Sequence, residues 1–92
     1  MNRSELIKRL QERLPELAEE DLKSAVEHII DSISQALEQE ARVEIRKFGA
    51  FSTSTHKAKK VRNPKSGEAI FMEEKRKVKF RPSRDLISKL NK

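Results

Sequence analysis

The apolar positions of the first forty residues recur at the spacing of amphipathic helices. Asn2 followed by Glu5 is typical of a helix N-cap with a carboxylate three positions later. Pro15 then predicts that this helix ends just before it, because proline interrupts a helix interior. The apolar stripe of this first helix consists of Leu6, Ile7, Leu10 and Leu14.

A second helix is predicted to begin near Ala18, with acidic residues in its first turn that complement the helix dipole. Its apolar face spans about four turns and contains Leu22, Ala25, Val26, Ile29, Ile30, Ile33, Ala36 and Leu37. One short neighbouring helix cannot cover so wide a face, and a subunit interface is the natural use for the surplus. We assign Val26, Ile29 and Ile33 to a dimer core.

From Arg42 the period of the pattern changes to two. Residues 42–46 alternate polar and apolar side chains, which predicts a half-buried strand, and Gly49 would permit a tight turn or bulge between core residues Phe48 and Phe51. Polar residues 52–61 continue as a strand, 62–67 form a turn and 68–75 return. Val78 and Phe80 alternate with cations as a further strand.

The predicted fold is therefore α+β: two N-terminal helices, a three-stranded antiparallel sheet with a long protruding β-ribbon arm, and a short C-terminal helix. Ser83 would cap that last helix, with Leu86, Ile87 and Leu90 facing inward. We expect one domain over residues 1–92: a helical dimerisation part at 1–40, the sheet at 41–82 and the last helix at 83–92. The arm, at about 53–74, has few apolar anchors and would be flexible until a polyanion orders it.

Charge is divided sharply between the two halves of the chain. Residues 1–41 hold five Lys/Arg and ten Asp/Glu, whereas residues 42–92 hold sixteen and five, so their balances are −5 and +11. Such asymmetry indicates a polyanionic partner for the second half. With only 35% apolar residues and no cysteine, a monomer of 92 residues would bury a thin core, and oligomerisation is the expected remedy.

Arg62-Asn63-Pro64-Lys65-Ser66-Gly67 is the most informative segment, a turn sequence inside a run of basic residues. A cationic tip that carries one rigid apolar ring could enter a nucleic-acid groove, with the cations on phosphates and Pro64 wedged between base pairs. A solvated surface hairpin, with Pro64 as a turn former, is the alternative. The candidate phosphate contacts of the arm are Lys57, Lys59, Lys60, Arg62 and Lys65, and those of its flanks are Lys75, Lys77, Lys79, Arg81 and Arg84.

Three segments together resemble the bacterial histone-like HU and integration host factor proteins over essentially the whole chain. They are Phe48-Gly49-Ala50-Phe51, the 62–67 turn and Phe80-Arg81-Pro82, in the expected order and spacing. Within that family, residues 43–46 are most similar to the β subunit of integration host factor.

The resemblance implies an intertwined dimer whose two arms embrace double-stranded DNA in the minor groove. Pro64 would intercalate and hold a kink, with Arg62, Asn63 and Lys65 beside it, and Arg46, positioned by Glu44, would reach the groove. Phe48, Phe51 and Phe80 match aromatics of the shared dimer core. Lys47 and Glu40 occupy positions where the family often has glycine, and Lys47 adds a cation and stiffens the turn.

The implied role is architectural: the protein would bend and condense DNA in the nucleoid and so support recombination, replication and transcription. The partner subunit could be a second copy or a sister subunit. For Glu44 and Arg46 a simple surface ion pair is the alternative to sequence reading. For the whole protein, the alternative is an RNA-binding or ribosome-associated protein, although no stacking aromatics are expected on exposed strands.

Other functional classes find little support in the sequence. His28 and His56 are isolated and lack cysteine or carboxylate companions, so we expect no metal site, no cofactor and no small-molecule substrate. No nucleophile, base and orienting group form a set, so we do not expect an enzyme. The absence of a signal region and of a long apolar run predicts a soluble cytoplasmic protein without a membrane partner.

Overall fold

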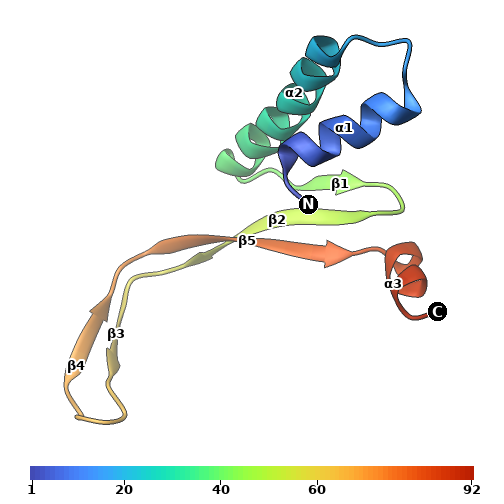
Figure 1. Cartoon of the computed structure of the whole chain (residues 1–92). Helices are drawn as coiled ribbons and strands as arrows, with labels where there is room; N and C mark the ends of the chain where they lie inside the picture. The colour runs from blue at the N-terminus through green and yellow to red at the C-terminus, as the bar shows by residue number, and fades with distance from the viewer. The chain divides into compact units, whose positions relative to one another are not determined.

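A computed structural model describes all 92 residues and confirms the predicted α+β fold (Figure 1). The elements in chain order are α1 (Arg3–Arg13), α2 (Glu19–Glu38), β1 (Val43–Ile45), β2 (Gly49–His56), β3 (Lys59–Arg62), β4 (Ala69–Met72), β5 (Lys75–Pro82) and α3 (Arg84–Leu90). The chain divides into two compact units, residues 1–35 and 36–92, and the boundary falls in the sequence of α2. No helix is both long and apolar enough to cross a membrane.

The first unit is a helical pair with a small core. The Asn2 side chain accepts a hydrogen bond of 2.9 Å from the Glu5 backbone N–H and so caps α1. Ile7, Leu22 and Val26 are buried, and Leu6, Leu10 and Ile30 pack against them. Val26 is thus covered within the single chain, whereas Ile29 is 59% exposed and Ile33 is half-buried.

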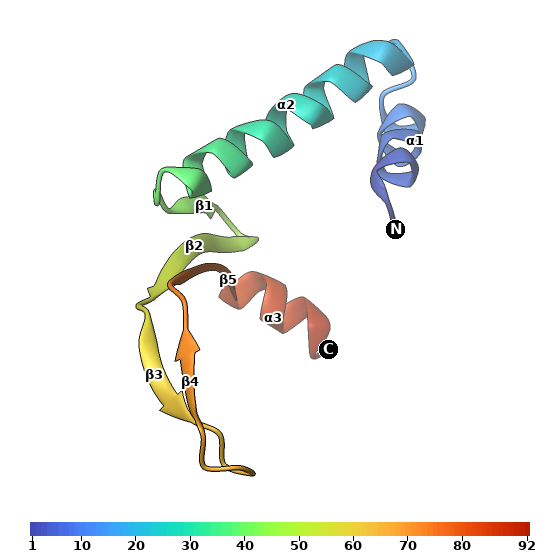
Figure 2. The ribbon, with the colours of Figure 1, turned by 90° about the vertical axis from the view of Figure 1, so that its left-hand side faces the viewer.

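The second unit contains two antiparallel sheets, which are joined because β2 leads into β3 and β4 leads into β5. β1, β2 and β5 form a three-stranded sheet in the order β1-β2-β5, and β3 pairs only with β4. Figure 2 shows the β3–β4 ribbon extending from the end of β2 and β5 that lies away from α3. This ribbon, with its connecting tip, is the predicted arm.

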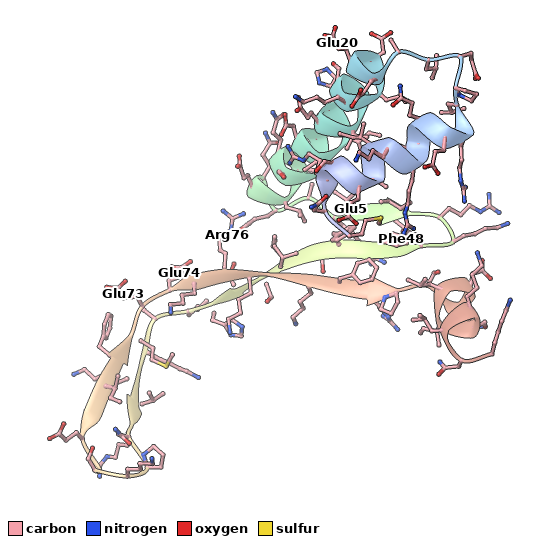
Figure 3. All side chains as sticks on the ribbon, viewed as in Figure 1. Glu5, Glu20, Phe48, Glu73, Glu74 and Arg76 are labelled. Carbon is pink, nitrogen blue, oxygen red and sulfur yellow. The ribbon has the colours of Figure 1, made fainter.

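The arm is not the uninterrupted strand expected for residues 52–61. Pairing stops between His56↔Lys75 and Lys59↔Met72, and the ribbon bends there (Figure 1). Glu73 and Glu74 lie at this bend (Figure 3). Two residues are left unpaired on each strand, so the register is the same on both sides of the interruption.

Phe48, Phe51 and Phe80 form an aromatic cluster on one face of the three-stranded sheet. The Phe80 ring centroid lies 4.8 Å from that of Phe51 and 5.2 Å from that of Phe48. Phe48 and Phe80 remain 43% and 40% exposed. The cluster is therefore formed within the chain but is only partly covered by it.

Gly49 serves a different purpose from the predicted one. The left-handed residue of the turn between β1 and β2 is Lys47, with φ of 67°, and Gly49 is paired in β2 opposite Ile45. A Cβ at Gly49 would lie 2.6 Å from the Arg81 carbonyl oxygen and 2.6 Å from the Phe80 ring. Gly49 is required for close packing of the aromatic cluster, because no side chain fits beneath Phe80.

The last helix is capped as expected, but its apolar face is not buried. The Ser83 hydroxyl accepts a hydrogen bond of 3.1 Å from the Leu86 backbone N–H. Leu86 is half-buried, yet Ile87 is 44% exposed and Leu90 is 73% exposed. The expectation that all three residues face inward is wrong for the single chain, since the seven-residue helix has too little of the chain beside it.

Candidate nucleic-acid interface

One face of β5 carries a row of four cations. In an antiparallel ladder, residues directly opposite each other project to the same face. Lys75, Lys77, Lys79 and Arg81 oppose His56, Ser54, Ser52 and Ala50. All four cations are exposed, and three of their cross-strand neighbours are small. The row therefore presents long cationic side chains that the small neighbouring side chains do not obstruct, which suits contact with a phosphate backbone.

β1 extends this face at the end opposite the arm. Glu44 pairs with Ala50 and so shares the face with Arg81. A hollow of about 250 Å³ lies there, lined by Arg42, Glu44, Ile45, Arg46, Lys47, Gly49, Ala50, Arg81, Pro82 and Ser83. Four of these residues are cations and one is an anion, so the hollow favours negatively charged ligands.

The ion pair of Glu44 is not with the predicted partner. Its Oε2 lies 3.9 Å from Nη2 of Arg42, a residue that sequence reasoning had not selected. Both side chains are largely exposed, at 63% and 72%. Arg46 lines the same hollow, but the ion pair of Glu44 is with Arg42, so Glu44 does not position Arg46 in the free protein. Alternation along the strand could have identified Arg42, since it lies two residues before Glu44.

On the arm, the predicted cations divide between the two faces. Lys60 opposes Phe71 and Arg62 opposes Ala69, so these four residues share one face. Lys59 opposes Met72 on the other face, and Lys57 falls in the interruption between the two ladders. Two unpaired residues on each strand separate the two ladders, and a hollow at this interruption is lined by His56, Lys75 and Lys77 of the β5 face together with Lys59 and Met72 of the arm. The charge of the arm is therefore divided between its two faces.

The tip is a closed loop of six residues with Pro64 exposed. The Asn63 N–H donates a hydrogen bond of 2.8 Å to the Glu68 carbonyl, and the Gly67 N–H donates one of 2.7 Å to the Asn63 carbonyl. The Asn63 side chain also accepts a bond of 2.9 Å from the Lys65 N–H. Gly67 is left-handed, with φ of 75°. Pro64 has no N–H to satisfy, and its fixed φ suits the second position of a turn that begins at Asn63.

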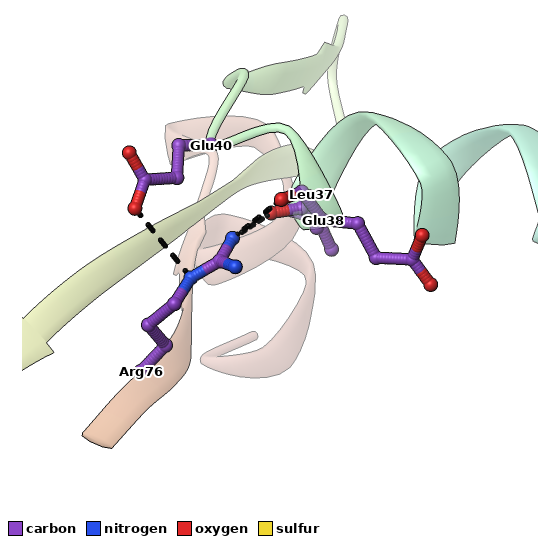
Figure 4. A network of polar contacts seen from close by, with 4 residues as sticks. All are labelled: Leu37, Glu38, Glu40 and Arg76. Carbon is purple, nitrogen blue, oxygen red and sulfur yellow. Dashed lines mark hydrogen bonds and ion pairs between the residues drawn. The ribbon is translucent and has the colours of Figure 1, made fainter. Parts of the chain in front are cut away.

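Arg76 interrupts the sequence of cations on β5 and points to the other face. It opposes Thr55, and its Nη2 donates hydrogen bonds of 2.9 Å and 2.7 Å to the carbonyls of Leu37 and Glu38 (Figure 4). Its Nε lies 3.5 Å from Oε1 of Glu40. The Glu38 carbonyl gains a partner and the Leu37 carbonyl a second one, since it also accepts from the Glu40 N–H, and a cation at this helix end complements the helix dipole.

The remaining predicted cations lie at the turn and the last helix. Lys47 is exposed in the β1–β2 turn, and Arg84 is exposed in the first turn of α3. Of the two histidines, His28 is exposed on α2 and His56 lies opposite Lys75 on the cationic face. The position of His56 on that face was not recognised, because it depends on the cross-strand register.

Comparisons with known proteins identify relatives over the whole chain. The family model described as bacterial DNA-binding protein matches residues 1–91. Integration host factor subunit beta of Herminiimonas arsenicoxydans is 42% identical over 91 residues, covering 99% of this chain and 90% of that protein. The same subunit of Burkholderia mallei (strain SAVP1) is 38% identical and covers 99% and 85%.

Solved structures share the fold at lower identity. The chain in the Anabaena HU–DNA cocrystal structure superimposes with a TM-score of 0.80 at 23% identity, covering 98% of this chain and 97% of that one. A mutant HU from Thermotoga maritima gives a TM-score of 0.70, also at 23% identity, with 98% and 99% covered.

Proposed function

The chain belongs to the bacterial DNA-binding protein family of HU and integration host factor, whose members are architectural DNA-binding proteins, and on this premise we propose how it acts on DNA. Two copies of the fold, or one copy and a sister subunit, hold duplex DNA between two arms. Each arm lies in the minor groove, and Pro64 at its tip enters a base step and kinks the duplex.

The cation row on β5 is the observation that carries this proposal. Lys75, Lys77, Lys79 and Arg81 are exposed on one face of β5, and beyond the bend Lys60 and Arg62 share one face of the arm. Residues 52–81 hold ten Lys/Arg and three Asp/Glu, a balance of +7. Two such surfaces could neutralise roughly ten phosphates, and the logarithm of affinity would then fall by about 0.9 per contact for each decade of salt.

Exposed Pro64 supports bending by a wedge. Its ring lies at the end of a ribbon whose loop is held by the Asn63 hydrogen bonds, so the ring is presented on a preformed tip. Unstacking a base step costs a few kcal/mol, which is offset when the bent duplex contacts more of the protein. Arg46 and Lys47 line the hollow at the end of the sheet opposite the arm, and they would contact the backbone or groove of the duplex away from the kink.

The small number of buried apolar residues in the single chain supports the proposal of a dimer. Ile7, Leu22, Val26 and Ala50 are the buried apolar residues of the chain. In the second unit, Phe48, Phe80, Val78, Ile87 and Leu90 leave large apolar surfaces exposed. In the first unit, Ile29 does the same. A partner subunit that covers these surfaces would supply the core that 92 residues lack.

Binding of the purified chain to a short fluorescent duplex, measured by anisotropy over a range of salt concentrations, tests the proposal. Replacing Lys77 and Lys79 together by Gln should weaken binding and reduce the salt slope. Replacing Lys8 and Lys23 together by Gln removes the same charge from the helices and should change neither. Equal effects of the two double variants would contradict the cation row as the binding surface. Stronger competition by structured RNA than by duplex DNA would favour an RNA-binding protein instead.

A further inference from the structure

Phe71 is a large apolar side chain on the face of the arm that carries Lys60 and Arg62, here called the cationic face of the arm. It opposes Lys60 in the β3–β4 ladder, and the next pair toward the tip on the same face is Arg62 with Ala69. Phe71 is 64% exposed, the most of any phenylalanine in the chain. A ring in this position costs free energy in water unless something covers it.

The other apolar residues of the arm have apolar companions. Val61 opposes Ile70 on the opposite face, and Met72 follows two residues after Ile70 on that same face. Val61 is half-buried, and Ile70 and Met72 are each 43% exposed. Phe48, Phe51 and Phe80 contact one another elsewhere in the sheet. Phe71 has no apolar companion larger than alanine: its neighbours on its face are Lys60, Arg62 and Ala69, with Glu73 two residues further along the strand at the bend.

We propose that Phe71 is a second apolar DNA contact, which enters the minor groove behind the tip. This inference rests on the proposed function. Lys60 and Arg62, on the same face as Phe71, would hold phosphates on the groove walls and bring the ring against sugars and base edges. Apolar side chains, phenylalanine among them, are the residues that minor-groove proteins insert in this way. Phe71 is two residues, or roughly 7 Å, from the Arg62–Ala69 pair that closes the ribbon before the tip.

The first test compares two threonine substitutions on adjacent residues of β4. Phe71→Thr removes the ring from the cationic face, and Ile70→Thr removes an apolar side chain from the other face, while threonine retains strand propensity. We expect Phe71→Thr to raise the Kd for duplex DNA about tenfold, equal to about 1.4 kcal/mol. Ile70→Thr should change it less than about twofold, since its face does not meet DNA.

Salt dependence separates an apolar contact from a disturbed arm. A lost phosphate contact would reduce the salt slope by about 0.9, whereas loss of an uncharged ring leaves it unchanged. We therefore expect parallel salt plots for Phe71→Thr and the unaltered protein. A reduced slope, or equal losses for Phe71→Thr and Ile70→Thr, would overturn the proposal.

The second test uses the absence of tryptophan and tyrosine from the chain. Phe71→Trp and Ile70→Trp each introduce a single fluorophore, on opposite faces of the same strand. With DNA bound, Trp fluorescence of the first variant should be quenched by the bases and shielded from acrylamide, and that of the second should remain accessible. Equal accessibility would overturn the inference while leaving the proposed function intact. Failure of the unaltered protein to bind DNA would overturn both.

Discussion

Arg76 donates a hydrogen bond of 2.9 Å to the backbone carbonyl of Leu37, which lies 39 residues earlier in the chain (Figure 4). The bond ties the root of the arm to the last turn of α2. Lys75 and Lys77, the neighbours of Arg76 in the chain, project from the opposite face of β5, because the side chains of successive strand residues point to alternate faces. One strand therefore divides its cations between holding the fold and, as proposed, binding DNA.

Neighbouring substitutions on β5 should separate stability from DNA binding. Arg76→Gln removes the contacts to α2 and to Glu40, and we expect the free energy of unfolding to fall by about 1 kcal/mol, since the pair is partly exposed. Lys77→Gln should leave stability nearly unchanged but weaken DNA binding. Urea denaturation and salt-dependent anisotropy measure the two effects. The division of roles fails if both variants alter the same quantity.

Gly49→Ala should destabilise the protein although it adds only a methyl group. The new Cβ would lie 2.6 Å from the Arg81 carbonyl oxygen, a backbone atom that cannot move without shifting β5. We expect a loss of about 1–3 kcal/mol, typical of overpacking. Gly67→Ala is the informative comparison, because its Cβ would meet no atom and its cost would come from the left-handed φ alone. Thermal denaturation should show the larger loss at Gly49.

Lys47→Gly should stabilise the fold while weakening DNA binding. Lys47 has φ of 67°, a conformation that costs a side-chain-bearing residue about 1 kcal/mol and glycine much less. Removing the cation should also reduce the salt slope by about 0.9 for each phosphate that Lys47 contacts. Lys47→Gln keeps a long side chain with the same backbone cost but has no charge, so it should reproduce only the binding change. An unaltered salt slope in both variants would exclude Lys47 from the DNA surface.

Ile29→Glu should dissociate the proposed dimer without unfolding the helical pair. Ile29 is 59% exposed in the single chain, so a carboxylate there meets water in a monomer but would be buried in an interface. Sedimentation should detect a dimer for the unaltered protein and a monomer for the variant. Val26→Glu is a contrasting control: it places charge in the core of the helical pair and should unfold it. A monomeric unaltered protein would contradict the dimer, unless a sister subunit restores assembly.

Local signals in the sequence were sufficient to predict the three helices and the strands β1 and β5. Asn2 and Ser83 cap helices where expected, and the period-two pattern gave β1 and β5. These features depend on neighbours within a few residues. The same reasoning could not show why Gly49 is glycine, because the atoms that exclude a Cβ belong to residues about thirty positions away.

Long-range register limited prediction of the candidate site. The partners of Arg76, the pairing of Glu44 with Arg42 and the shared face of Phe71 and Lys60 are consequences of geometry between segments. Composition identified a cationic second half but could not assign its lysines to faces, because residues 52–60 are almost entirely polar and lack an apolar alternation. The break at residues 57–58 was likewise invisible in a polar strand without an apolar pattern.

The bend angle of DNA at saturating protein, measured by energy transfer between fluorophores on the duplex ends, tests the central claim most directly. The unaltered chain, with its sister subunit if one is required, should bring the ends together. Pro64→Ala keeps the exposed position and the Asn63 hydrogen bonds but removes the ring, so it should reduce the bend more than the affinity. Equal bends for the two proteins would contradict the wedge, and a straight duplex with the unaltered protein bound would contradict the account of the protein as a DNA-bending clamp.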